Sequence, residues 1–205
     1  MSGWRFLLRL AGWLDAPPRL IGRAVSWAFL PMILIIIVDA LSRKYLRKLD
    51  FVVENDLHGY FNSPIFQDAE WHLHTIIFLG ALGYAYSRNA HVRLDIIRPK
   101  LGEKGRLWVE FLCGLTLLLP FLAVIAYYAW DFFILAWESD EGSGVNNGIE
   151  DRWAIKFWTV LGPVLLMLAG TAMLLRLFVR LFGPEAVAGE TRTEAIADEN
   201  FSAYG

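Results

Sequence analysis

Four long apolar stretches, separated by polar segments, dominate the pattern of hydrophobic and polar positions along the chain. An α-helix rises about 1.5 Å per residue and the hydrocarbon core of a membrane is about 30 Å thick, so about 20 apolar residues suffice to cross it. The pattern therefore predicts an all-α integral membrane protein with four transmembrane helices, at about residues 20–41, 65–87, 107–137 and 153–181. The stretch at 107–137 is longer than necessary, and we expect it to tilt strongly or to project from the membrane.

The polar residues around the start of the 65–87 stretch make it the best-marked of the four. Its section 71–87 contains no charged residue, whereas acidic residues and histidines lie around its beginning. Asp68 lies four residues before His72, which is about one helical turn. Glu70 stands in the same relation to His74. We therefore expect each histidine to meet the carboxylate one turn before it.

The first 18 residues combine two arginines, Arg5 and Arg9, with several apolar and aromatic residues. A cleaved signal peptide needs a longer uninterrupted apolar core and small residues at a cleavage site. A short interfacial helix fits the segment better. We expect this helix to end at Pro17 and Pro18, because proline interrupts a helix.

Two features of the first predicted span, 20–41, concern its shape and its charge. Pro31 lies near the middle of the span and predicts a kink, as Pro120 does in the third span. Asp39 lies near the end of the span. Its carboxylate is either an ion ligand within the membrane or the partner of Arg43 one turn later, and we favour the ion pair.

Lysine and arginine are distributed unevenly between the two predicted sides of the membrane. Thirteen lie in the N-terminal segment, the loop after the second span and the C-terminal part, and six lie at the opposite ends of the spans. Cytoplasmic segments carry the excess of these residues, so both termini are predicted to be cytoplasmic. The acidic, glycine-rich segment 138–151 is then an exposed loop on the other side. The chain divides into an interfacial segment at 1–18, a four-helix membrane domain at 19–182 and an acidic, disordered tail at 183–205.

The composition agrees with a membrane protein and gives no case for other broad classes. Of the 205 residues, 56% are hydrophobic, and the mean hydropathy is +0.42. A formal net charge of −2 offers no electrostatic case for binding nucleic acid. The single cysteine, Cys113, cannot form a disulfide within the chain or a multi-cysteine metal site. We expect the lipid bilayer, and no nucleic acid, among the partners of this chain.

The positions of the four histidines do not suit haem ligation. A pair of axial ligands requires two histidines at matching depth in two spans. His72 and His74 lie two residues apart on different faces of one helix, His91 lies beyond the other end of that helix, and His58 lies in a loop. We therefore predict no cofactor and no catalytic, cofactor-binding or metal-ligating residue.

Polar residues at mid-membrane depth are almost absent, so the sequence does not predict a transport pathway through this chain alone. Glycines lie within the spans instead, and small residues allow helices to approach closely. These are Gly80, Gly83, Gly162 and Gly170. The pattern favours a scaffold or partner subunit.

Three short segments carry a pattern typical of one protein family. They are Glu70-Trp71-His72 at the start of the second span, His91-Val92-Arg93-Leu94-Asp95 in the loop after it, and Gly148, Arg152-Trp153 and Ile155-Lys156 at the entry to the last span. Over roughly residues 20–182, the chain resembles the small membrane subunit (Q-type, DctQ-like) of tripartite ATP-independent periplasmic (TRAP) transporters.

The resemblance implies a non-catalytic subunit of a multi-pass complex in the bacterial inner membrane. A large permease subunit would hold the substrate and sodium sites, and a periplasmic solute-binding protein would deliver an organic-acid-type solute. The sodium gradient would drive uptake, and this chain would be a scaffold for the permease. The resemblance assigns Arg93 and Asp95, in the same segment as His91, to fixing the cytoplasmic loop. It assigns structural or subunit contacts at the periplasmic end of the second span to Glu70, Trp71 and His72.

Two other functions remain open from the sequence. A membrane anchor subunit of a redox complex would contain haem or quinone, which the placement of the histidines disfavours. A homo-oligomeric channel would require polar residues lining a pore.

Overall fold

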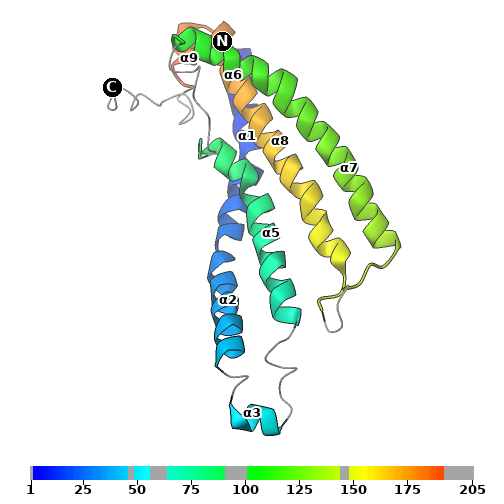
Figure 1. Cartoon of the computed structure of the whole chain (residues 1–205). Helices are drawn as coiled ribbons and strands as arrows, with labels where there is room; N and C mark the ends of the chain where they lie inside the picture. Colours follow the sequence, from blue (N-terminus) through cyan, green and yellow to red (C-terminus); the bar gives the residue numbers. More distant parts are fainter. Residues whose placement is uncertain (1, 46–48, 56–63, 91–100, 144–147, 192–205) are drawn as a thin grey trace.

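The computed structural model describes residues 2–45, 49–55, 64–90, 101–143 and 148–191. Helices account for nearly all of these residues, and no strand occurs among them. The helices are α1 (Ser2–Ser26), α2 (Phe29–Lys44), α3 (Asp50–Glu54), α5 (Pro64–Ser87), α6 (Glu103–Cys113), a π-helical segment (Gly114–Leu118), α7 (Leu119–Glu138), α8 (Arg152–Phe182) and α9 (Glu185–Ala188). They form an elongated bundle with α3 at one end and the start of α1 at the other (Figure 1).

The N-terminal helix continues through Pro17 and Pro18, so the prediction that it ends there is wrong. Both prolines lack an N–H group, but proline φ values are compatible with a helix. Pro18 is buried, and α1 packs on both α5 and α8. This packing compensates for the missing backbone hydrogen bonds.

The break between α1 and α2 confirms the kink expected from Pro31. In a continuous helix the Pro31 ring would collide with the Trp27 carbonyl, four residues earlier. The chain instead makes tighter backbone hydrogen bonds from Trp27 to Ala24 (3.2 Å) and from Ala28 to Val25 (3.0 Å) before α2 begins. The first predicted span is therefore formed by the end of α1 together with α2.

The third predicted span is a continuous helical run from Glu103 to Glu138, which begins earlier than expected. It contains the π-helical segment Gly114–Leu118 directly before Pro120. Proline cannot donate the regular helical hydrogen bond, and a π-helical turn is one way in which a helix adjusts to that loss. The helix thus has a widened turn next to Pro120, and the kink expected at Pro120 stays a prediction.

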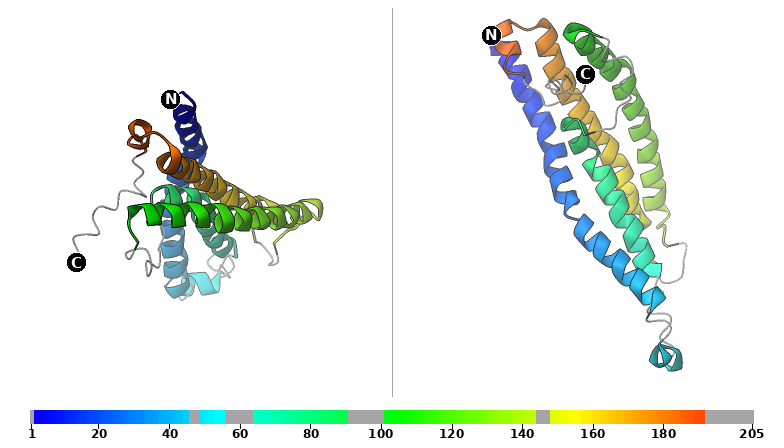
Figure 2. Two further views of the ribbon diagram at one scale, coloured as in Figure 1. Left: turned by 90° about the horizontal axis from the view of Figure 1, so that it is seen from above. Right: turned by 60° about the vertical axis from the view of Figure 1, so that its left-hand side comes forward.

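Helices α5 and α8 form the centre of the bundle, with α1 against both, α2 against α5 and α7 against α8 (Figures 1 and 2). A Cβ atom on Gly83 would lie 2.7 Å from the Leu165 carbonyl oxygen, and one on Gly162 would lie 3.0 Å from the Leu79 Cβ. Real Cβ atoms essentially never approach backbone as closely as the first contact. The predicted role of the glycines in close helix packing is confirmed.

Three helical runs in the described part of the chain are long and apolar enough to cross a membrane, namely Ser2–Lys44, Glu103–Glu138 and Arg152–Phe182. Helix α5 is not among them, so the structure does not confirm the predicted count of four. The reason is the polar first half of α5, which contains Asp68, Glu70 and two histidines.

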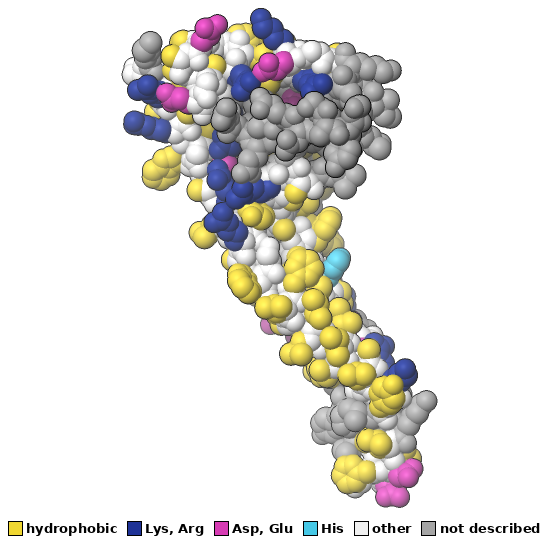
Figure 3. Space-filling view, turned by 90° about the vertical axis from the view of Figure 1, so that its left-hand side faces the viewer, with side chains coloured by type: hydrophobic (Ala, Val, Ile, Leu, Met, Phe, Trp, Pro, Cys, Tyr) yellow, Lys and Arg dark blue, Asp and Glu magenta, His cyan; other side chains and the backbone are white. Residues whose placement is uncertain are grey.

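The outer surface of the narrow part of the bundle is largely apolar. Figure 3 shows apolar side chains covering much of the narrow part of the molecule. Many belong to α2, whose exposed large side chains are Phe29, Leu30, Ile33, Leu34, Ile36, Ile37, Val38 and Leu41. Such a surface is suited to lipid or to other membrane helices.

The first residues of the predicted disordered tail form α9, whose Val187 is buried. Glu190 lies 3.4 Å from Arg5 of α1 in an exposed ion pair. The start of α1 and the segment that follows α8 therefore lie at the same end of the bundle (Figure 1). Residues 192–205 lie outside the described part.

Candidate functional site

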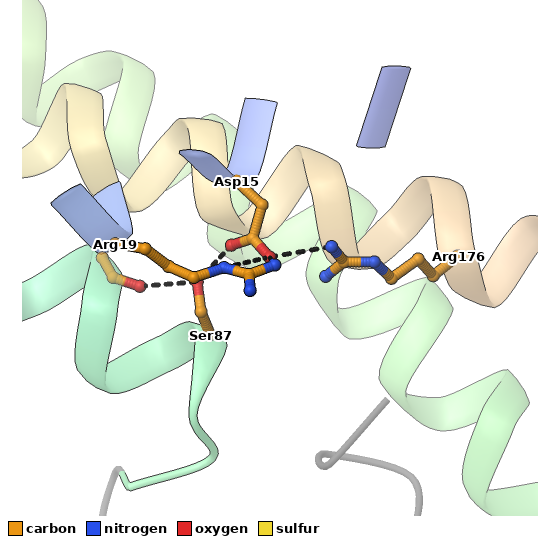
Figure 4. A network of polar contacts seen from close by, with 5 residues as sticks. Asp15, Arg19, Ser87 and Arg176 are labelled. Carbon is orange, nitrogen blue, oxygen red and sulfur yellow. Dashed lines mark hydrogen bonds and ion pairs between the residues drawn. The ribbon is translucent and has the colours of Figure 1, made fainter. Parts of the chain in front are cut away.

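A buried carboxylate, Asp15 of α1, connects the three central helices (Figure 4). Its Oδ2 accepts hydrogen bonds from Arg19 Nε at 3.0 Å and from Arg176 Nη2 of α8 at 2.7 Å. Its Oδ1 accepts a hydrogen bond from the Ser87 hydroxyl at the end of α5, at 2.5 Å. Asp15 is 1% exposed, so both oxygens are satisfied away from solvent. We call Asp15, Arg19, Ser87 and Arg176 the Asp15 junction.

Two positive charges share one negative charge in the Asp15 junction. Arg176 is mostly buried, whereas the Arg19 side chain is 42% exposed. Burying ions is costly unless they are paired and hydrogen-bonded, and here every oxygen of the carboxylate has a charged or hydroxyl donor. The arrangement holds α1, α5 and α8 at a fixed mutual position. It presents no free nucleophile, acid or base.

A second carboxylate, Asp68, connects the start of α5 to the loop between α7 and α8. Asp68 Oδ1 accepts a hydrogen bond from Trp71 Nε1 at 3.0 Å. Its Oδ2 accepts from the Ile149 amide at 2.9 Å and from the Ser143 hydroxyl at 3.3 Å. A Cβ atom on Gly148 would lie 2.5 Å from Asp68 Oδ2, so only glycine leaves room for this approach. We call Asp68, Trp71, Ser143 and Ile149 the Asp68 junction.

Asp68 lies outside the three candidate spans, and its surroundings favour the ionised form. Burial by itself raises the pKa of the carboxyl group. The hydrogen bonds from Trp71, the Ile149 amide and Ser143 outweigh burial, with a smaller electrostatic contribution from His72, and the pKa is lowered from its ordinary value of 3.8.

The entry to α8 reinforces this end of the bundle. The Arg152 guanidinium lies 6.0 Å from the centre of the Trp71 ring, in a cation–π geometry. Lys156 forms an ion pair with Glu141, and Trp153 packs edge-on against Trp137 at 4.5 Å between ring centres. These contacts, together with the Asp68 junction, hold the acidic loop after α7 against α5 and α8.

Two of the six predicted site residues, Trp71 and His72, lie at the Asp68 junction. Trp71 belongs to it, and His72 packs against Trp71 with ring centres 3.9 Å apart. His72 Nδ1 meets the Asp68 carbonyl oxygen at 2.5 Å, so the predicted contact with the Asp68 carboxylate is wrong. The carboxylate oxygens are taken by Trp71 and by the loop.

The predicted contact between Glu70 and His74 is also wrong, because no hydrogen bond or ion pair joins them in the described structure. Glu70 Oε1 is buried without a hydrogen-bond partner there. The other three predicted site residues, His91, Arg93 and Asp95, lie outside the described residues, so their proposed role in the loop stays a prediction. Among the residues that the structure describes, no three His, Cys, Asp or Glu side chains form a group suited to a metal ion.

Sequence reasoning found the Asp39–Arg43 ion pair, which is confirmed, but not the Asp15 junction. Asp15 and Arg19 have the same spacing of four residues, and this signal was available. Arg176 lies 161 residues after Asp15, and no local pattern connects them. Likewise, Ser143 and Ile149 lie at least 75 residues after Asp68.

Comparison with known proteins gives one family. The model of the family described as "Tripartite ATP-independent periplasmic transporters, DctQ component" matches residues 32–180, which is most of the chain. No curated protein matches the chain, and no solved structure does. The matched region contains the Asp68 junction and, from the Asp15 junction, Ser87 and Arg176.

Proposed function

This chain belongs to the DctQ component family of tripartite ATP-independent periplasmic transporters. On that basis we propose that it is a rigid support for the large permease subunit. In this proposal the large subunit holds the solute and sodium sites. A periplasmic binding protein delivers an organic-acid-type solute, and the sodium gradient drives its uptake. This chain holds the permease in place in the inner membrane and performs no chemistry.

The Asp15 junction is the observation that supports the proposal best. Transporters build their substrate and ion sites near the bilayer midplane from broken helices, whose polar groups are available to the ligand. Asp15 instead has both oxygens occupied by donors from three helices, and Gly83 fixes the approach of two of them. A closed network of this kind resists rearrangement and suits a static support.

The proposed topology has four crossings with both termini in the cytoplasm. Helix α5 would cross with its charge-free section 71–87, while Asp68 remains at the periplasmic surface. The excess of lysine and arginine at one end supports this orientation. The ion pair between Arg5 and Glu190 supports it too, because it brings the first helix and the end of α8 to one side.

Co-purification of the tagged chain with its large permease subunit tests the proposal. We expect a stoichiometric complex from mild detergent, and solute uptake that is lost when this chain is deleted. The Asp15→Asn variant should lower the yield of the complex, whereas Arg5→Gln, at an exposed ion pair, should leave it unchanged. Recovery of the chain only as a self-associated oligomer, or with a haem absorption band, would contradict the proposal and favour a channel or a redox anchor.

A further inference from the structure

The face of α1 beside the Asp15 junction carries more positive charge than the described carboxylates neutralise. Arg23 lies one turn after Arg19 and is exposed. Its guanidinium lies near the Tyr84 hydroxyl of α5. None of the ion pairs among the described residues includes Arg23. Arg19 and Arg176 share Asp15 as their single carboxylate. Three guanidinium groups, two from α1 and one from α8, therefore stand against one carboxylate, and the two from α1 are the more exposed.

This basic group lies where α5 ends and the chain leaves its apolar section. Ser87 is the last residue of α5, and Arg88 follows it, with its guanidinium 5.7 Å from the centre of the Tyr84 ring. In Figure 3, which faces the α1 and α2 side of the molecule, Lys and Arg side chains gather directly beside the apolar surface of the narrow part. Positive groups at the border of an apolar surface match the level of lipid phosphates.

Large apolar side chains continue from the basic group along the same helix. Leu20 is 72% exposed and Trp27 is 73% exposed, and the two lie seven residues apart on one face of α1. Arg19 and Arg23 lie beside this face. The helix thus offers guanidinium groups for a headgroup and, directly next to them, apolar surface for acyl chains.

We propose that Arg19, Arg23, Leu20 and Trp27 form a binding site for an anionic phospholipid. The guanidinium groups pair with the headgroup phosphate, and the acyl chains lie along Leu20 and Trp27. Arginine suits this task because its planar fork of donors matches phosphate oxygens. The site depends only on the chain being in a membrane, and it goes beyond the proposed role as a permease support.

Native mass spectrometry of the full chain, released from phosphatidylcholine nanodiscs that contain a minor fraction of phosphatidylglycerol, tests the site. We expect retained phosphatidylglycerol on the unmodified chain. Arg23→Gln should reduce this retention about fivefold, as expected for loss of one basic residue near a membrane surface. Arg23→Lys, which keeps the charge but lacks the planar fork of donors, should reduce retention less than Arg23→Gln does.

Arg5→Gln is the matched control, because it removes the same charge from the same helix outside the site. It should leave phosphatidylglycerol retention unchanged. Helix content and elution volume would confirm that each variant is folded. The proposal is overturned if Arg23→Gln retains as much phosphatidylglycerol as the unmodified chain, or if both glutamine variants lose it equally. Displacement of the lipid by inorganic phosphate would also overturn it, in favour of a site for a free anion.

Discussion

Two aspartates of the N-terminal region, Asp15 in α1 and Asp39 in α2, are each followed four residues later by an arginine with which they pair. Both are almost completely buried, at 1% and 0% exposure. Asp15 gains Arg176 and Ser87 from two other helices. Asp39 has no such partner in the described structure, and its Oδ1 is buried without a hydrogen bond.

The difference follows from the neighbours of each helix. Helix α1 packs against α5 and α8 together, whereas α2 packs against α5. At a contact of three helices, one carboxylate can satisfy donors from all of them, and its removal leaves each donor unsatisfied. The Asp–Arg pair of α1 is therefore part of a contact between three helices, whereas the equivalent pair of α2 stays within its own helix.

Removing the Asp15 carboxylate should have the largest effect. Asp15→Asn leaves the mostly buried Arg176 without its counter-charge, and we expect a loss of about 3 kcal/mol in the free energy of unfolding. Denaturant titration of the detergent-solubilised chain, followed by circular dichroism, measures it. Arg19→Gln should cost less, because Arg19 is 42% exposed. If Asp15→Asn lowers the free energy of unfolding by no more than about 1 kcal/mol, which is typical of exposed ion pairs, then Asp15 does not connect the three helices as described.

A Cβ atom at Gly83 tests whether close packing places Ser87 within reach of Asp15. Gly83→Ala would put this atom 2.7 Å from the Leu165 carbonyl oxygen, and we expect a loss of about 2 kcal/mol from overpacking. Gly12→Ala in α1 is the control, since nothing lies within 4 Å of its added atom. That variant should gain about 0.5 kcal/mol from helix propensity. The same titration measures both, and equal behaviour of the two glycines would rule out the packing role.

At the opposite end of the bundle, the stabilisation that Asp68 provides should depend on pH. Its pKa is lower in the folded protein than its ordinary value of 3.8, so the carboxylate stabilises the fold fully above that value. The stabilisation is lost as the pH falls through the lower, folded-state pKa. Asp68→Asn should cost about 1.5 kcal/mol at neutral pH. We expect this difference from the unmodified chain to shrink on acidification below 3.8, as measured by stability at a series of pH values; a constant difference would contradict it.

Asp39→Asn should have the smallest effect. The variant loses an ion pair to Arg43, whose side chain is 44% exposed, but it also removes a buried charge with one unsatisfied oxygen. These contributions oppose each other, and we expect a change of less than about 1 kcal/mol in the free energy of unfolding. If Asp39→Asn proves as damaging as Asp15→Asn, the distinction between the two aspartates fails.

The helices and their irregularities could be predicted from the sequence because they depend on nearby residues. Apolar runs predicted the long helices, Pro31 predicted the break before α2, and the spacing of Asp39 and Arg43 predicted their ion pair. Local reasoning was wrong at Pro17 and Pro18, where packing on α5 and α8 overrides the preference of proline to end a helix. It was also wrong at His72, because distant donors occupy the Asp68 carboxylate.

The sequence by itself determined the all-helical membrane character, the family resemblance and the glycines at helix contacts. These follow from hydrophobic pattern, residue size and short motifs, which are properties of neighbouring positions. Only the tertiary structure decided which aspartate connects three helices. Arg176 and Ser87 reach Asp15 because three helices meet there, and a contact across 161 residues leaves no trace in the local spacing.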